Sequence, residues 1–231
     1  MNILLIAGHG GTPYDPGAVS GGFTEAVLAR EVTFKLKTML EKNAFVTVFD
    51  TNTDMYKYLS KKSFDFKKFD KVYEIHFNAG AGDSKGNGKT TGSEILISSK
   101  KKNTKEDLQI LKNLEGLGFK NRGIKTKSDL RNMNICSGQG VDYSLIEICF
   151  IDDRDDMKIY SDNPSKIASA IADGIIPVPE LTTPNDIVWE LGARNIISDK
   201  QGILSEMAEN PNGRLYWLAR KAVNFMRSKG V

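Results

Sequence analysis

The chain contains only two histidines, and each stands at the end of a strand-like apolar run. His9 follows the run 3–7 inside a glycine-rich turn, and His76 closes the run 71–76. Open α/β sheets bind ligands in the crevice beyond the carboxyl ends of their strands. A single such histidine is explained by a hydrogen bond at a turn, but two at separate strand ends predict a metal site.

A carboxylate close to His9 in the chain offers an oxygen ligand for the same site. Glu25 falls in the first turn of a helix that leaves the His9 loop, and we expect that turn to face back toward the strand end. The helix dipole alone favours a carboxylate there by about 0.3–1 kcal/mol. From the pattern, Glu25 is therefore either a metal ligand or an ordinary helix-terminal acid.

Glu147 is the charged residue that stands in the most apolar surroundings. It interrupts the strand-like run 145–151, where an unpaired buried charge costs several kcal/mol. Either a cation held by His9 and His76 neutralises it, or burial raises its pKa toward the range of a general acid or base. The alternative is an edge strand on which Glu147 faces solvent.

Alternation along the strands adds three polar candidates. With a period of two, Asn78 and Glu74 share a face with His76. Asn78 is then a candidate to support a metal ligand or to hydrogen-bond substrate, and Glu74 either orients the imidazole or lies exposed on a half-solvated strand. By the same parity Cys149 shares the face of Glu147, where it could be a ligand, although packing in the core is the favoured prediction.

Two histidines, one carboxylate and an open fourth position are typical of a hydrolytic zinc site. Zinc lowers the pKa of bound water to about 7 and polarises a carbonyl, while a nearby glutamate moves the proton. Other hydrolytic and phosphate-binding motifs do not occur. There is no His-Glu-x-x-His and no Gly-x-Ser-x-Gly, and residues 88–90 lack the upstream glycine of a phosphate-binding loop.

The order of elements predicts an α/β fold with a largely parallel sheet, because strand-like and helix-like patterns alternate along the chain. Thr24 is the expected N-cap of the first helix, and residues 79–91 read as a flexible, glycine-rich surface loop. Residues 121–140 carry no assignable pattern. The predicted strands are 2–7, 45–49, 71–77, 94–98 and 143–151, and the predicted helices include 24–42, 105–117 and 164–176.

Composition restricts the class of protein. The chain has 231 residues, of which 40% are hydrophobic and 26% charged, as in a soluble globular protein. A net charge of +3 gives no indication of nucleic-acid binding. No apolar run is long enough to span a membrane, and no signal peptide is visible at the N-terminus. Cys136 and Cys149 are expected to be free thiols of a protein made in a reducing compartment.

Three prolines between residues 177 and 184 predict a linker. It separates a domain at 1–176 from a small all-helical mini-domain at 185–231. Helical patterns in the mini-domain cover residues 186–194, 200–209 and 214–227. Trp189, Tyr216 and Trp217 either stack on sugar rings or, as aromatic residues at helical spacing more often do, pack in a core.

The motifs, taken in order, resemble those of the zinc-dependent N-acetylmuramoyl-L-alanine amidases of bacterial autolysins and phage endolysins. The matching residues are Gly8-His9-Gly10-Gly11, Asp15-Pro16-Gly17-Ala18, Glu25, His76-Phe77-Asn78-Ala79 and Ile146-Glu147-Ile148-Cys149-Phe150. The resemblance covers about residues 1–176 and implies a twisted sheet of about six strands flanked by helices. It also implies that Zn²⁺ is bound by His9, Glu25 and His76, with Glu147 as the catalytic glutamate.

The reaction implied by the resemblance is hydrolysis of the amide between N-acetylmuramic acid and L-alanine in peptidoglycan. The two-domain plan is similar to that of phage endolysins, which implies synthesis in the cytoplasm, release, and a C-terminal unit that binds the cell wall or mediates oligomerisation. After the glutamate many relatives continue Gly-Phe, where this chain has Ile148-Cys149-Phe150. The alternatives are a zinc peptidase acting within the stem peptide and a non-catalytic wall-binding protein.

Overall fold

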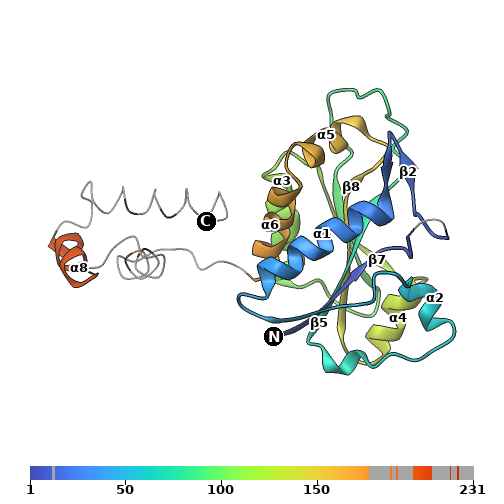
Figure 1. The fold of residues 1–231 in the computed structure, drawn as a ribbon, viewed down its shortest axis with the longest axis horizontal. Helices are drawn as coiled ribbons and strands as arrows, with labels where there is room; N and C mark the ends of the chain where they lie inside the picture. The colour runs from blue at the N-terminus through green and yellow to red at the C-terminus, as the bar shows by residue number, and fades with distance from the viewer. Residues whose placement is uncertain are drawn as a thin grey trace. The chain divides into compact units, whose positions relative to one another are not determined.

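The computed structural model of the chain describes residues 1–11, 14–176, 188, 191, 200–209, 219 and 223 (Figure 1). It contains two compact units, Met1–Pro177 and Val178–Val231. Among the described residues, no helix combines the length and hydropathy needed to cross a bilayer.

A six-stranded sheet forms the centre of the first unit, in the order β4-β1-β5-β8-β6-β7. Neighbouring strands run parallel except for β6 and β8, which are antiparallel. The predicted mostly parallel sheet is therefore confirmed. The strands are β1 (Asn2–Ala7), β4 (Phe45–Val48), β5 (Lys71–Asn78), β6 (Ser93–Ser98), β7 (Asn121–Lys127) and β8 (Asp142–Phe150).

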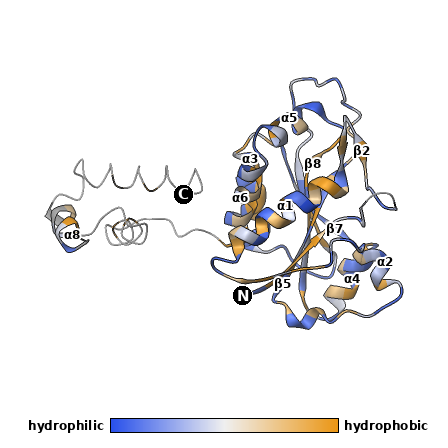
Figure 2. Cartoon of the chain, viewed as in Figure 1, coloured by the Kyte–Doolittle hydropathy of each residue, from blue (hydrophilic) through white to orange (hydrophobic). Residues whose placement is uncertain are grey.

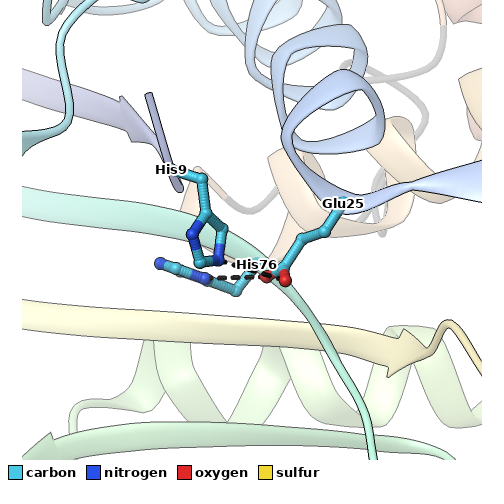
Figure 3. Close-up of side chains that lie close together, drawn as sticks. All are labelled: His9, Glu25 and His76. Carbon is cyan, nitrogen blue, oxygen red and sulfur yellow. Dashed lines mark hydrogen bonds and ion pairs between the residues drawn. The ribbon is translucent and has the colours of Figure 1, made fainter. Parts of the chain in front are cut away.

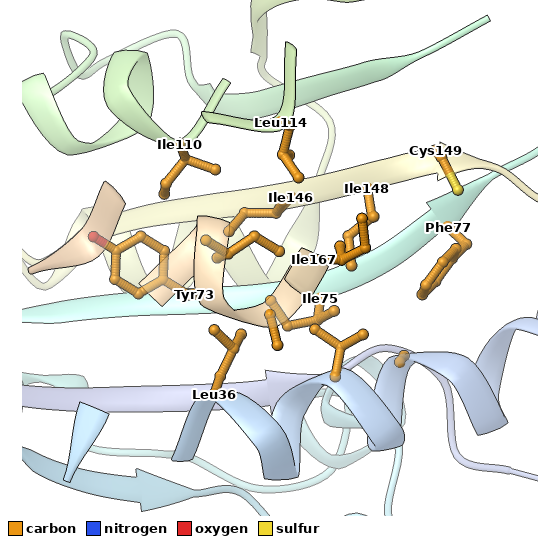
Figure 4. Packing of buried hydrophobic residues seen from close by; sticks show 14 of the residues in the cluster. Leu36, Tyr73, Ile75, Phe77, Ile110, Leu114, Ile146, Ile148, Cys149 and Ile167 are labelled. Atoms are coloured by element: carbon orange, nitrogen blue, oxygen red, sulfur yellow. The ribbon is translucent and has the colours of Figure 1, made fainter. Parts of the chain in front are cut away.

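Helices α1 (Glu25–Leu40), α3 (Lys105–Glu115) and α6 (Pro164–Ile175) cover one face of the sheet. Figure 4 shows Ile110 and Leu114 of α3 directed toward Ile146 of β8, in a core that also contains Tyr73 and Ile75 of β5. In Figure 2 the central strands are coloured mainly hydrophobic, whereas the helices carry both colours. This distribution agrees with a parallel sheet that is buried on both faces.

The opposite face of the sheet packs against α2 (Met55–Leu59) and α4 (Arg131–Gly138). Met55 of α2 and Met133 of α4 are buried there with Leu145 of β8. Glu74, His76 and Glu147 belong to this second face by strand parity. The site residues therefore project toward α2 and α4.

A β-bulge interrupts the pairing of β5 with β8. His76 stands opposite Glu147, but Asn78 stands opposite Phe150, so that Ile148 and Cys149 together face one residue of β5. Both residues lie in the core beneath α1, α3 and α6. The prediction that Cys149 shares the face of Glu147 is therefore wrong, because the bulge breaks the alternation, while its predicted packing in the core is confirmed.

Several elements differ from the sequence prediction. The unassigned segment 121–140 contains β7 and α4, and a short hairpin lies between the glycine-rich turn of His9 and α1. Thr24 precedes α1 as expected, but its side chain makes no capping hydrogen bond. The remaining short elements are β2 (Val19–Ser20), β3 (Phe23–Thr24), the 3₁₀ turn η1 (Phe66–Lys68) and α5 (Arg154–Asp162).

The second unit contains α8 (Lys200–Glu209), which confirms the predicted helix there. Met207 of this helix is buried with Val188, Leu191, Ala219 and Val223. The predicted linker 177–184 lies outside the described residues, as do most residues of the predicted helices 186–194 and 214–227. The proposed domain division stays a prediction.

Candidate metal centre

His9 reaches the site because the chain stays attached to the sheet after β1 ends. The Gly8 N–H donates to the carbonyl of Ile75 at 2.9 Å. A Cβ at Gly8 would lie 2.5 Å from Cε1 of His76, so only glycine fits between the two strand ends. His9 itself has φ of 64°, a left-handed conformation that costs a non-glycine residue about 1–2 kcal/mol.

Glu25 lies between the two imidazoles, at the start of α1. One carboxylate oxygen is 3.1 Å from Nε2 of His9 and the other is 2.9 Å from Nδ1 of His76. Figure 3 shows the carboxylate approaching both rings from the side of the helix. Backbone N–H groups of Ala18 and Phe77 also donate to it, at 2.9 and 3.1 Å. The folded chain thus brings together the three residues predicted to bind metal.

The outer nitrogen of each histidine faces a further carboxylate. Nδ1 of His9 lies 2.9 Å from Asp15, and Nε2 of His76 lies 3.4 Å from Glu74. Both side chains therefore have an acidic partner of the kind that orients metal-binding histidines. The predicted orienting position of Glu74 agrees with this geometry, since Glu74 is buried rather than exposed.

The three central groups perturb one another electrostatically. Burial alone would raise the pKa of Glu25, but hydrogen bonds from His76 and His9 outweigh it and hold that pKa well below its ordinary value. Burial lowers the pKa of His76, yet the carboxylates of Glu25 and Glu74 raise it well above its ordinary value. Glu25 is therefore an ionised oxygen donor that attracts positive charge to this point.

The donor set fits a small divalent cation. One atom from each of His9, Glu25 and His76 can be chosen so that all lie within 4.8 Å of one another. Zinc bonds of about 2.0–2.1 Å in tetrahedral geometry separate neighbouring ligand atoms by about 3.3 Å. The two nitrogen–oxygen distances of 3.1 and 2.9 Å are close to that value. Two imidazole nitrogens and one carboxylate are also ligands that zinc prefers.

Glu147 lies on β8 directly opposite His76. Because β8 is paired on both sides, with β5 and β6, the edge-strand alternative is excluded. Its Oε2 atom is buried and has no hydrogen-bond partner among the described residues. Burial, reinforced by the nearby carboxylates of Glu25 and Glu94, raises the pKa of Glu147 to about 7, although the positive charge of His76 opposes this shift.

A polar chain on the other side of Glu147 includes two residues that the sequence patterns did not single out. Glu94 of β6 pairs with Glu147 across the strands and accepts hydrogen bonds from Arg122, at 2.8 Å, and Asn78, at 3.0 Å. Glu94 begins a predicted strand, so its parity could have suggested this position. Arg122 lies in the unassigned segment and gave no such signal.

A cavity of about 350 Å³ adjoins the histidines and extends toward α2 and α4. Tyr56 and Arg131 stand on its far side, with the guanidinium 4.1 Å from the ring centre. The cavity is lined by His9, Asp15, Asp54, Tyr56, Glu74, His76, Asp129, Leu130, Arg131, Asn132, Met133, Tyr143 and Leu145. Two of the three candidate metal ligands, His9 and His76, therefore open onto a space large enough for part of a substrate.

Comparisons with known proteins agree with this arrangement. A curated relative, "Probable autolysin PH" of Staphylococcus aureus, is 27% identical over 194 residues. The match covers 75% of this chain but only 38% of that relative.

Two solved structures show the same fold. The catalytic domain of the CD27L endolysin targeting Clostridia difficile is 26% identical, with a TM-score of 0.60, over 76% of this chain and 97% of that one. The CwlD amidase from Clostridioides difficile, solved in complex with the GerS lipoprotein, is 25% identical with a TM-score of 0.59. That match covers 75% of this chain and 95% of that one.

The family model described as N-acetylmuramoyl-L-alanine amidase matches residues 3–177. This range coincides with the sheet unit that holds His9, Glu25, His76 and Glu147. The chain belongs to the N-acetylmuramoyl-L-alanine amidase family.

Proposed function

We propose that the chain is a zinc-dependent peptidoglycan hydrolase that cleaves the amide between N-acetylmuramic acid and L-alanine. The observation that carries this proposal is the His9–Glu25–His76 cluster beside a buried carboxylate oxygen without a partner among the described residues. Membership of the amidase family supports the choice of bond.

In this proposal His9, Glu25 and His76 hold Zn²⁺. When bound, the ion supplies a Lewis acid that polarises a carbonyl and makes water acidic enough to lose a proton near neutral pH. Glu25 contributes the negative charge that balances the cation, and its contacts with Ala18 and Phe77 fix its position.

Glu147 is the proposed proton carrier. A carboxylate with a pKa of about 7 is suited to accept a proton and to return it near neutral pH. Its Oε2 atom would take the proton of the attacking water and then deliver it to the leaving nitrogen of L-alanine. Asn78 is the proposed substrate contact, with its amide placed beside Glu94 at 3.0 Å.

Mass spectrometry of digested peptidoglycan tests the proposal directly. We expect intact stem peptides with a free L-alanine amine, together with glycan strands that carry free lactyl carboxyl groups. Chelator should abolish their release, and added zinc should restore it. Fragments cut between amino acids of the stem would instead identify a peptidase, and wall binding without fragments or zinc would identify a non-catalytic binder.

The second unit is proposed to bind the cell wall or to mediate oligomerisation, in an endolysin that acts on the wall after release. Likeness of the sheet unit to the catalytic domain of an endolysin supports this setting. Two measurements on the inactive Glu147→Ala protein separate the two roles. Co-sedimentation with purified walls tests wall binding, and the mass of the protein in solution tests oligomerisation.

A further inference from the structure

The two candidate histidine ligands present different nitrogens to Glu25. His9 faces it through Nε2, whereas His76 faces it through Nδ1. In Figure 3 the second ring nitrogen of His76 points away from Glu25. Because a neutral imidazole carries its proton on one nitrogen only, the nitrogen that binds metal must be the one without it.

Without a metal, Glu25 itself lies within hydrogen-bonding distance of Nε2 of His9 and Nδ1 of His76. Once these two nitrogens bind a metal, the outer carboxylates determine which nitrogen keeps the proton. Asp15 can only accept a hydrogen bond from Nδ1 of His9, which leaves Nε2 unprotonated. Glu74 faces Nε2 of His76, which leaves Nδ1 unprotonated. The arrangement therefore requires opposite tautomers in two histidines of the same site.

Glu74 is itself held in place by two buried side chains from different elements. Asn132 of α4 donates to one carboxylate oxygen at 3.1 Å, and the hydroxyl of Tyr143 on β8 donates to the other. Glu74, Asn132 and Tyr143 are 5%, 7% and 3% exposed. A buried carboxylate with two fixed donors has little freedom to turn away from the His76 ring.

We infer that Glu74, clamped by Asn132 and Tyr143, is a positioning residue that fixes His76 in the Nε2–H tautomer and presents Nδ1 to the metal. This inference rests on the proposed zinc site and assigns three further residues to it. Without the clamp, His76 can place its proton on Nδ1 and donate to Glu25, which removes the lone pair needed for zinc.

Nitrogen-15 NMR of the zinc-loaded protein shows which ring nitrogen of each histidine binds the metal and which keeps its proton. The chain contains only two histidines. We expect one ring with Nδ1–H and the other with Nε2–H. If both rings keep the proton on the same nitrogen, the inference is wrong.

Zinc affinity, measured by competition with a chromophoric chelator, gives a second readout. We expect Glu74→Gln to weaken zinc binding about 10–100-fold, as loss of such a partner typically does. Tyr143→Phe and Asn132→Leu should each weaken it less. In a protein that already carries Glu74→Gln, Tyr143→Phe should cause no further loss of zinc affinity, because Tyr143 acts through Glu74. If Tyr143→Phe lowers zinc affinity equally in the wild type and in Glu74→Gln, the proposed role of Tyr143 is wrong.

Ser144→Ala is the matched control. It removes another buried hydroxyl of β8 that donates to a carboxylate, that of Asp107, on the opposite face of the sheet. Its zinc affinity should equal that of the wild type, and a loss as large as that of Tyr143→Phe would indicate general destabilisation and contradict the inference. If the wild type binds no zinc, the proposed function fails. If it binds zinc and Glu74→Gln binds zinc equally tightly, the inference alone is wrong.

Discussion

Glu147 lies on a central strand of the sheet and has a pKa raised to about 7. One of its carboxylate oxygens is buried and has no hydrogen-bond partner among the described residues. Replacing Glu147 by alanine should lower the rate of wall hydrolysis by about 10²–10⁴-fold, the usual contribution of a general acid or base. Zinc content should stay the same, because Glu147 is not among the proposed ligands. Clearing of a wall suspension and metal analysis measure the two effects.

His76→Ala is the paired variant for that prediction. It removes a proposed ligand, so both zinc and hydrolysis should be lost. Clearing at the normal rate by Glu147→Ala would refute the proposed proton carrier. Full zinc content in His76→Ala would refute the proposed ligand set.

Gly8 leaves no room for any side chain. Gly8→Ala would place a Cβ 2.5 Å from Cε1 of His76, and such overpacking typically costs about 1–3 kcal/mol. We expect weaker zinc binding and a lower free energy of unfolding, measured by chelator competition and urea denaturation. Gly138→Ala is the control, because its Cβ would meet nothing within 4 Å. Equal effects from both variants would contradict this account.

The chemical groups of the site were more predictable from the sequence than the side chains that support them. His9, Glu25, His76 and Glu147 stand out because each is a titratable residue beside a glycine-rich turn, at a strand or helix end, or inside an apolar run. Tyr143 gave no such signal. It contacts Glu74 from 69 residues away, a pairing that only the folded sheet creates.

At the scale of elements, the loop that follows β5 is tied to the segment after β8 through Asp152. Its carboxylate accepts hydrogen bonds from the N–H groups of Gly80, Ala81 and Gly82, at 2.8–3.2 Å. Burial raises the pKa of Asp152, but these three donors outweigh it and hold the pKa below its ordinary value of 3.8. The loop predicted to be flexible is thus attached to the sheet by a charged anchor.

This anchor makes stability depend on pH in a defined direction. Because the folded pKa is lower than the unfolded one, the contribution of Asp152 is complete above about pH 5 and is lost as the pH falls through the folded pKa. Asp152→Asn should destabilise the protein by about 1–2 kcal/mol at pH 7, a value reduced for solvent screening.

Urea denaturation of the wild type and Asp152→Asn, from about pH 2.5 to about pH 7, measures the difference in the free energy of unfolding. It should be constant above about pH 5 and shrink below pH 4. A difference that does not change with pH would mean that the ionised carboxylate of Asp152 contributes nothing through these hydrogen bonds.

Most strands were predictable because buried parallel strands are largely apolar runs, as β1 is and as β8 is around Glu147. β7 was not, because its sequence, Asn-Arg-Gly-Ile-Lys-Thr-Lys, is that of a polar edge strand paired on one side only. The bulge in β8 was hidden for the opposite reason. Both bulge residues, Ile148 and Cys149, are apolar, and so is Phe150, which follows them. An added apolar residue in an apolar run leaves no visible change in the sequence pattern.

At the scale of the whole molecule, the sheet unit should act without the second unit. It has its own core, and the family match ends at residue 177. A chain shortened to residues 1–177 should keep zinc binding and hydrolysis of soluble peptidoglycan fragments within about threefold of the full chain, since domains with their own cores fold alone.

The same shortened chain separates catalysis from attachment. Sedimentation with intact walls should fall if the second unit supplies wall affinity, while hydrolysis of soluble fragments is unchanged. Loss of hydrolysis in a folded 1–177 protein, as judged by circular dichroism, would show that residues beyond 177 complete the site.

The bulge at Ile148 and Cys149 has a consequence for any attempt to shorten or redesign this strand. The extra residue determines on which face of the sheet each residue after Glu147 lies, and so how the segment that begins at Asp152 is directed. Deleting one of the two residues restores strict alternation, so that Glu147 and the downstream anchor can no longer both point the right way. The number of residues in β8 therefore matters for activity. A one-residue deletion there should lower wall hydrolysis more than substitution of either Ile148 or Cys149 does.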